Sequence, residues 1–195
     1  MPSSVGHEVL ECASRAARDS DLPLLLAVSG GLDSMVLLDA FAAVAATRVA
    51  AVATFDHATG AHATRAARLV AREARRRGLA VVTGRLSDGA SGRNGLEAMW
   101  REARHRFLAD AAQARGARVV TAHTRDDQIE TVLMRELRGS GARGLAGQAA
   151  ASPIARPFLT LRRSALEGYA RARGVWWVED PSNESRAFLR NRVRH

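Results

Sequence analysis

Short apolar runs alternate with longer amphipathic stretches along most of this chain. The runs at 24–28, 48–55, 79–83 and 118–122 are rich in Val, Leu and Ala and have the length of buried strands. A shorter run at 154–159 is a candidate fifth strand. Helical patterns cover residues of about 35–44, 61–77, 95–115, 125–138 and 162–173. Strands that alternate with helices predict a parallel sheet, because parallel neighbours need helical crossovers.

The predicted fold class is α/β. We expect a Rossmann-like, three-layer sandwich in which helices cover both faces of a parallel sheet of about five strands. Ligands of such sheets bind at the carboxyl ends of the strands. Four polar segments follow predicted strand ends, at 29–34, 55–57, 123–130 and 156–158. These segments are therefore expected to meet around one ligand site.

The segment 29–34 reads Ser-Gly-Gly-Leu-Asp-Ser and joins the first strand to a helix. Its adjacent glycines allow the backbone to approach phosphate oxygens, and amide groups at a helix N-terminus attract anions. The two serines add hydroxyl donors, and Asp33 is suited to hold a magnesium ion that bridges phosphates. An ordinary turn with Ser and Asp as caps is the alternative. Two glycines in succession favour the phosphate cradle.

The cradle lacks the Lys of a Walker-type P-loop, since every one of the 29 basic residues is Arg. Its sequence instead resembles the pyrophosphate loop of the N-type ATP pyrophosphatases. This resemblance implies that ATP is gripped by its β,γ-pyrophosphate and split between the α- and β-phosphates. AMP is then transferred to an oxygen of the substrate.

Phe55 and His57 flank Asp56 at the end of the second predicted strand. A flat side chain and backbone groups at this position are suited to contact an adenine ring. The alternative is ordinary turn chemistry, with Asp56 as a cap and His57 incidental, and the residues alone favour it.

The stretch 123–131 reads His-Thr-Arg-Asp-Asp-Gln-Ile-Glu-Thr and follows the fourth predicted strand. Asp127 and Glu130 share a helix face, and Thr124-x-x-Asp127 also forms a capping box. Three clustered carboxylates exceed what capping requires. They are expected to bind magnesium or a substrate ammonium group, or to take a proton from an attacking amine. An apolar stripe is expected to seat this helix: Ile129, Val132, Leu133 and Leu137.

The stretch 139–144 matches G-x-G-x-x-G but follows a predicted helix, so it is no dinucleotide fingerprint. We expect a Gly-rich loop near the substrate, in which Arg138 and Arg143 meet phosphate or base.

Composition narrows the class of protein. With 195 residues, 47% of them hydrophobic and 25% charged, the chain fits one globular domain. Short hydrophobic runs and an N-terminus without a signal pattern predict no membrane span and a cytoplasmic location. One cysteine, Cys12, excludes an internal disulfide and a four-cysteine metal or iron–sulfur site. The net charge of +9 favours polyanionic partners, although a solvated arginine-rich surface explains it equally well.

Taken in order, six segments resemble the catalytic domain of the bacterial tRNA(Ile)-lysidine synthetases: SGGLDS, FDH, NGLEAMWREARHRF, TAHTRDDQIETVLMRELRGSGARGLAG, ARPFL and VEDPSNESRAFLRNRVRH. The resemblance implies a two-step reaction on the wobble cytidine of tRNA(Ile) with a CAU anticodon. ATP adenylates the C2 oxygen and pyrophosphate is released. The amine of free L-lysine then displaces AMP to give lysidine. ATP and Mg²⁺ are the implied cofactors, no membrane is involved, and a homodimer is left open.

The resemblance also implies roles for residues. Asp127 and Glu130 serve lysine and proton transfer, Arg104 assists near the reacting phosphate, and Asp33 and Asp127 hold the metal. Implied ATP-binding residues are Ser29, Gly30, Gly31, Leu32, Asp33, Ser34, Phe55, His57 and His123. Implied contacts to tRNA or substrate are Arg101, Arg138, Arg143, Asp180, Asn183, Arg190, Asn191, Arg192 and Arg194.

Two features depart from the family pattern. Family members usually carry Gly-Leu after the histidine of the second strand end, where this chain has Ala58 and Thr59. They also continue into domains that help to grip tRNA. We expect residues 1–195 to form one catalytic domain with its core at about 20–180 and a truncated helical segment from 181, the C-terminal tRNA-binding domains being absent.

Three rival functions are weighed against this one. A related enzyme adenylates the same oxygen but delivers sulfur, and those that use an iron–sulfur cluster need several cysteines. An amide-forming ligase with the same loop needs an ammonia source, and the chain has no amidotransferase cysteine constellation. A non-catalytic nucleotide- or RNA-binding module has no need of the acids Asp33, Asp127 and Glu130.

Overall fold

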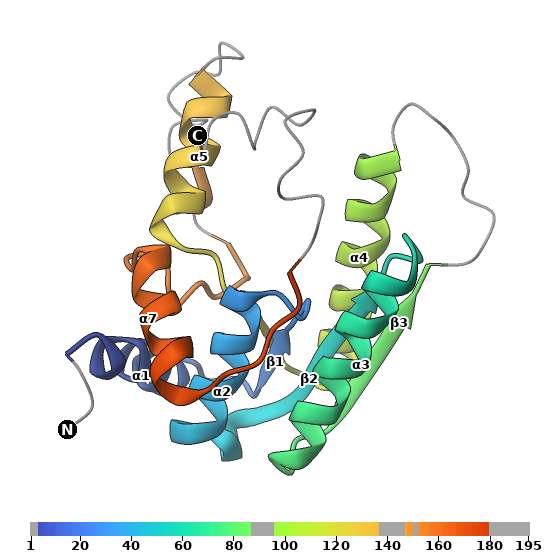
Figure 1. The fold of residues 1–195 in the computed structure, drawn as a ribbon. Helices are drawn as coiled ribbons and strands as arrows, with labels where there is room; N and C mark the ends of the chain where they lie inside the picture. The colour runs from blue at the N-terminus through green and yellow to red at the C-terminus, as the bar shows by residue number, and fades with distance from the viewer. Residues whose placement is uncertain (1–3, 87–95, 137–146, 150–151, 180–195) are drawn as a thin grey trace.

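The computed structural model describes residues 4–86, 96–136, 147–149 and 152–179 (Figure 1). Strands and helices alternate there as the sequence predicts, and the shared elements fall within a few residues of their expected bounds. The α-helices are α1 Ser4–Arg18, α2 Leu32–Val44, α3 Ala61–Arg76, α4 Leu96–Gln113, α5 Arg125–Glu136 and α7 Arg163–Arg173. The strands are β1 Leu24–Ala27, β2 Val49–Asp56, β3 Val81–Arg85 and β4 Arg118–Val120, and the short 3-10 helices are η1 Ala46–Arg48 and η2 Gly147–Ala149.

The four described strands form one parallel sheet in the order β3-β2-β1-β4, which confirms the predicted α/β class. The candidate fifth strand is reduced to a single parallel bridge between Val120 and Ala155. Pro157 has no amide hydrogen with which to continue the ladder. The chain turns there instead, and the amide of Leu159 donates to the carbonyl of Arg156 at 3.2 Å.

Alternating side chains along β1 divide the core into two layers, with helices on both faces of the sheet (Figure 1). Leu24 and Leu26 contribute to a large apolar cluster with α1, α2, α3 and α7. Leu25 contributes to a smaller cluster with Ala111 and Ala112 of α4. The three-layer arrangement is therefore as predicted. None of the described helices is long and apolar enough to cross a membrane.

Helix α1 was not predicted from the sequence. Its buried face consists of Val9, Cys12, Ala13 and Ala17, and charged residues occupy the opposite face, so the helical period is present in the sequence. The helix packs on α2 and α7 and covers the core from that side. Burial raises the pKa of the Cys12 thiol, so this cysteine is a protonated core residue.

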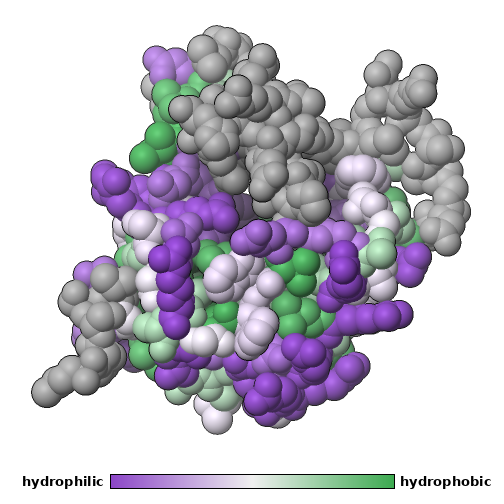
Figure 2. Space-filling model, in the orientation of Figure 1, coloured by the Kyte–Doolittle hydropathy of each residue, from purple (hydrophilic) through white to green (hydrophobic). Residues whose placement is uncertain are grey.

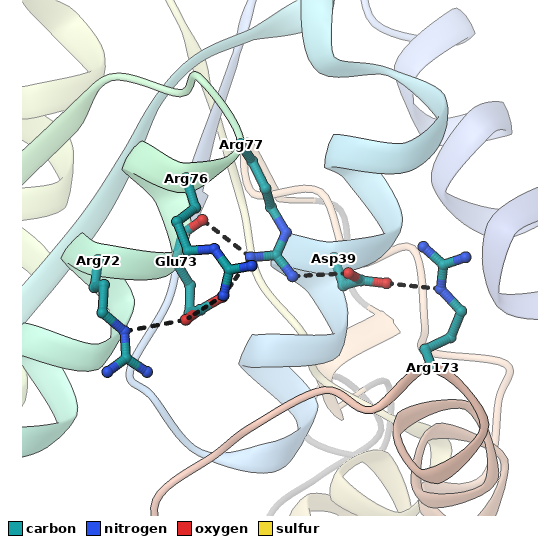
Figure 3. A network of polar contacts seen from close by, with 6 residues as sticks. All are labelled: Asp39, Arg72, Glu73, Arg76, Arg77 and Arg173. Atoms are coloured by element: carbon teal, nitrogen blue, oxygen red, sulfur yellow. Dashed lines mark hydrogen bonds and ion pairs between the residues drawn. The ribbon is translucent and has the colours of Figure 1, made fainter.

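A buried carboxylate joins three helices on this face of the sheet (Figure 3). Asp39 of α2 accepts hydrogen bonds from Arg77 at 2.9 Å, from Tyr169 at 2.9 Å and from Arg173 at 3.2 Å. Arg77, at the end of α3, also donates to Glu73 at 2.8 Å. Burial opposes the ionisation of Asp39, but these donors outweigh it and hold its pKa below the ordinary value. The network fixes α2, α3 and α7 relative to one another.

Candidate active site

The loop between β1 and α2 has the hydrogen bonds of a preformed anion cradle. The hydroxyl of Ser34 accepts from the backbone amides of Ser29 and Gly30, each at 3.1 Å, and donates to the carbonyl of Gly31 at 2.9 Å. Gly31 is the N-cap of α2, so no side chain caps the first amide groups of this helix. Leu32 is buried and anchors the loop in the core. The first turn of α2 is thereby left to bind an anion.

Gly30 is required at the bend of this loop for two reasons. Its φ of +93° lies in the left-handed region that favours glycine. A Cβ added at Gly30 would lie 2.9 Å from the Cβ of Ala66, because α3 packs directly on the loop. The carbonyl of Gly30 also accepts a hydrogen bond from the amide of Val178 at 2.9 Å. The cradle is therefore held between α3 and the chain after α7.

Asp33 faces Arg163, a residue that no sequence motif singled out. A guanidinium nitrogen of Arg163 lies 3.7 Å from Oδ2 of Asp33. Arg163 begins α7, and its backbone amide donates to Oδ2 of Asp126 at 2.8 Å. The starts of α2, α5 and α7 thus meet at one point, with a cation beside the anion cradle. The arginine was missed because it lies in an Arg-rich stretch typical of a solvated helix start.

Phe55 and His57 lie at the carboxyl end of β2, against aromatic residues of α4. The ring centroid of His57 is 5.0 Å from that of Phe55 and 6.3 Å from that of Trp100. Burial lowers the pKa of His57 and the positive charge of Arg104 lowers it further, so the ring is neutral near pH 7. Its buried Nδ1 has no hydrogen-bond partner among the described residues. A neutral ring with an unsatisfied nitrogen suits contact with a nucleobase.

Asp56 shows the turn chemistry that was the alternative interpretation of its segment. Its carboxylate accepts hydrogen bonds from the amide of Ala58 and the hydroxyl of Thr64, both at 2.9 Å. Asp56 therefore ties β2 to the start of α3. Ala58 has a φ of +55°, where a Cβ is strained and glycine is favoured. The departure from the family's Gly at this position thus carries backbone strain.

The acids of α5 have different surroundings. Oδ2 of Asp127 accepts from the amide of Thr124 at 2.9 Å and from its hydroxyl at 2.8 Å, which confirms the capping box. Glu130 is only 3% exposed, one turn further along. His123 lies just before the helix, with its Nδ1 2.9 Å from the hydroxyl of Thr121. Capping explains Asp127 but not the burial of Glu130, which marks Glu130 as a functional candidate.

The predicted seating stripe of α5 is wrong at Ile129 and Leu133, whereas Val132 is half-buried and Leu137 lies outside the described residues. Ile129 and Leu133 are 49% and 41% exposed, so this side of the helix does not face the core. Instead α5 contacts η2, where Gln128 accepts from the amide of Gln148 and Thr131 accepts from the Gln148 side chain. The polar face carries the contact because η2 offers backbone and amide groups rather than an apolar surface.

The fourth predicted segment supplies a half-buried arginine. Ala155 pairs with the end of β4, which places Arg156 at the carboxyl edge of the sheet. Burial lowers the pKa of Arg156, and its buried Nε has no hydrogen-bond partner among the described residues. Arg156 and Arg163 are therefore two cations that suit a phosphate ligand at this edge.

The structure says less about Arg104 and the residues predicted to contact tRNA or substrate. Arg101 is exposed on α4, whereas Arg104 is half-buried beside His57. Several predicted tRNA contacts lie outside the described residues: Arg138, Arg143, Asp180, Asn183, Arg190, Asn191, Arg192 and Arg194.

The donor set fits magnesium that is held mainly by phosphate. The described residues contain no group of three or more His, Cys, Asp or Glu that could enclose a metal ion. Magnesium usually takes one or two carboxylates together with substrate phosphates, and Asp33 beside the cradle meets that need. Asp127 as a second ligand stays a prediction.

The family model of the PP-loop domain, an ATP-binding domain, matches residues 6–195. The chain belongs to the PP-loop domain family. The cradle at 29–34, which the sequence pattern predicts to hold phosphate, lies within the matched residues.

This PP-loop domain is similar in sequence to proteins named tRNA(Ile)-lysidine synthase. It is 45% identical to that of Bradyrhizobium sp. over 88% of this chain and 50% of the relative. It is 40% identical to that of Rhizobium meliloti over 96% of this chain and 46% of the relative. It is 38% identical to that of Xanthomonas campestris over 95% of this chain and 45% of the relative. The chain thus spans about half the length of these relatives.

Solved structures share the fold at low identity. The U34-tRNA thiolase NcsA from Methanococcus maripaludis with its 4Fe-4S cluster superposes with a TM-score of 0.75 at 13% identity, covering 97% of this chain and 69% of that one. The NH3-dependent NAD synthetase from Campylobacter jejuni superposes with a TM-score of 0.59 at 14% identity, covering 88% of this chain and 72% of that one. At such identity the likeness shows the fold alone.

Proposed function

We propose that this PP-loop domain catalyses the ATP-dependent formation of lysidine on tRNA(Ile) with a CAU anticodon. The C2 oxygen of the wobble cytidine attacks the α-phosphorus of ATP, the bond to pyrophosphate breaks, and AMP remains on the oxygen. The ε-amine of free lysine then attacks C2. The C2–O bond breaks, AMP leaves, and the amine nitrogen loses a proton.

One observation carries the proposal: an anion cradle at 29–34 lies in a chain that is 38–45% identical to proteins named tRNA(Ile)-lysidine synthase. The cradle supports ATP binding, and the identity supports the tRNA and lysine substrates. Magnesium, a homodimer and a cytoplasmic location belong to the same proposal.

ATP supplies the adenylyl group and the pyrophosphate leaving group. The first-turn amides of α2 and the hydroxyls of the cradle hold the pyrophosphate, with Arg163 and Arg156 adding positive charge at the same edge. Neutral His57 contacts the adenine, and Arg104 beside it stabilises charge on the reacting phosphate. Asp33, together with phosphate oxygens, holds the magnesium ion.

Glu130 acts in the second step. Its carboxylate is buried on α5, the helix that follows β4, and a low dielectric there strengthens attraction to an ammonium group. It orients the lysine amine and then accepts the proton that the amine releases. Asp127 holds the start of α5 through its cap with Thr124 and adds negative charge beside Glu130.

Sulfur transfer is the principal alternative, because the NcsA thiolase shares the fold. A cluster-dependent thiolase needs exposed thiolates, whereas Cys12 is buried in the apolar core with a raised pKa. The residues of this chain therefore favour the ligase over the thiolase.

Pyrophosphate release from ATP tests the proposal directly. The protein is incubated with ATP, magnesium and a tRNA(Ile) transcript, with and without lysine. We expect tRNA-dependent formation of pyrophosphate, and AMP release together with lysine incorporation when lysine is added. Formation of ADP and inorganic phosphate, or turnover without tRNA, would reject it.

A further inference from the structure

Helix α3 exposes charge of a single sign. Apart from Ala61, every exposed residue of this helix is an arginine. They fall within an arc of about 100° and extend over about 16 Å of helix, given 100° and 1.5 Å per residue. Figure 2 shows hydrophilic side chains gathered over this part of the molecule. We call them the α3 arginine face: Arg65, Arg68, Arg72, Arg75 and Arg76.

The long helices α1 and α4 do not share this pattern. The exposed residues of α1 include Glu8 and Glu11 as well as Arg15 and Arg18. In the same way, α4 exposes Glu102 and Asp110 together with Arg101 and Arg106. A face that serves only solubility carries both signs. The α3 arginine face therefore differs from the exposed faces of α1 and α4.

The arrangement has an energetic cost. Like charges three or four residues apart on a helix repel one another and destabilise it. Glu73 offsets part of the repulsion, since it lies 3.1 Å from Arg72 and 3.9 Å from Arg76. The Glu73 side chain is only 8% exposed, so it lies beneath the exposed guanidinium groups rather than among them. A row of cations kept at such a cost fits a polyanionic partner.

The α3 arginine face begins beside the cradle. Ala66, next to Arg65, contacts Gly30 of the loop, and the helix then runs away from the carboxyl edge of the sheet. Building on the function proposed above, we propose that this face binds the phosphate backbone of the tRNA beside the anticodon. The arc exposes no large apolar side chain to enter a lipid surface, since its one exposed apolar residue is Ala61, which favours RNA over a membrane.

Salt dependence of RNA binding distinguishes a phosphate contact from bulk charge. In the test variant Arg65, Arg68 and Arg75 become Gln, which leaves the contacts of Glu73 intact. In the control Arg15, Arg18 and Arg171 become Gln, an equal change of net charge on exposed positions of α1 and α7. Dissociation constants for tRNA(Ile) transcript are measured over a range of salt concentrations, and circular dichroism checks folding.

For the parent we expect a linear dependence of log K on log salt. The test variant should lower its slope by about 2, given about 0.7–0.9 per lost phosphate contact. Affinity should fall at least about tenfold at moderate salt, while the control changes the slope by less than half as much. ATP affinity should be unchanged. Equal slopes in both variants, or none altered, would reject the α3 site and leave a solvated surface.

Kinetics separate this inference from the proposed function. In tRNA-dependent pyrophosphate release, the test variant should raise KM for tRNA and leave kcat unchanged. If the parent releases pyrophosphate with tRNA but the slopes do not differ, only the α3 site fails. If the parent binds tRNA through α3 but shows no tRNA-dependent release, the proposed reaction fails.

Discussion

Helix α2 carries two aspartates whose surroundings differ sharply. Asp39 accepts hydrogen bonds from Arg77, Tyr169 and Arg173 at 2.9–3.2 Å and is almost fully buried. Asp33, in the first turn of the same helix, is partly exposed and meets Arg163 at 3.7 Å. A carboxylate enclosed by short hydrogen bonds contributes to the packing of helices. One held loosely beside an anion cradle can exchange its partner for a metal ion.

The largest expected effect is on the chemistry at Asp33. Asp33→Ala should lower tRNA-dependent pyrophosphate release by about 100- to 1000-fold, because charge stabilisation at a reacting centre is lost. The free energy of unfolding should change little, since this carboxylate lies at the rim of the loop. Release assays and urea unfolding measure the two quantities. Activity within a few-fold of the parent would show that Asp33 only stabilises the first turn of α2.

The opposite pattern is expected at Asp39. Asp39→Ala should lower the free energy of unfolding by about 3 kcal/mol, because Arg77, Tyr169 and Arg173 lose a shared buried acceptor. Activity per folded molecule should be retained. Urea midpoints, read together with unchanged m-values, provide the measurement. A loss below about 1 kcal/mol would remove the contrast between the two aspartates.

Glu130 offers a third carboxylate with which to sharpen the comparison. Glu130→Gln keeps the shape but removes the carboxylate that we propose as counter-ion and proton acceptor of the lysine amine. We expect lysine incorporation to fall about 100-fold and adenylation to be nearly unchanged. The adenylated tRNA should then accumulate, and ATP labelled at the α-phosphate traps it. Equal loss of both steps would place Glu130 in the metal site instead.

The smallest effect concerns the arginine that faces Asp33. Arg163→Gln should weaken ATP binding by about fivefold, or about 1 kcal/mol, since a partly exposed cation beside phosphate is lost. Arg162→Gln is the matched control, because this neighbouring arginine is exposed and precedes the first residue of α7. Titration calorimetry with ATP and magnesium compares the two. An equal loss in both would mean that only bulk charge matters.

Local chemistry is what the sequence predicted well. The cradle at 29–34 is built from adjacent residues, so its glycine turn, serine donors and helix start are legible without tertiary information. The capping box of Thr124 and Asp127 is equally local, and it is confirmed at 2.8 and 2.9 Å. The same locality explains why the parallel sheet and its crossover helices were predicted.

Contacts between segments that are distant in the chain could not be predicted from the sequence. Arg163 reaches Asp33 only because α7 packs on α2, and nothing near either residue encodes that pairing. Helix α1 was missed although its apolar and charged residues follow a helical period. The stripe of Ile129 and Leu133 was misassigned because apolar spacing alone does not say which side of a helix meets the core.

The contact between Gly30 and Ala66 has a consequence for mutational tolerance. A Cβ at Gly30 would lie 2.9 Å from that of Ala66, so position 30 has no room for a side chain, and Ala66 on the facing helix is itself buried. In a saturation mutagenesis library, position 66 should accept little beyond Ala and Gly, while its exposed neighbour Arg65 accepts most polar residues without loss of folding. Positions 30 and 66 would then tolerate substitution to a similarly small extent. A substitution at either position is expected to impair ATP binding through the cradle, even though Ala66 belongs to α3.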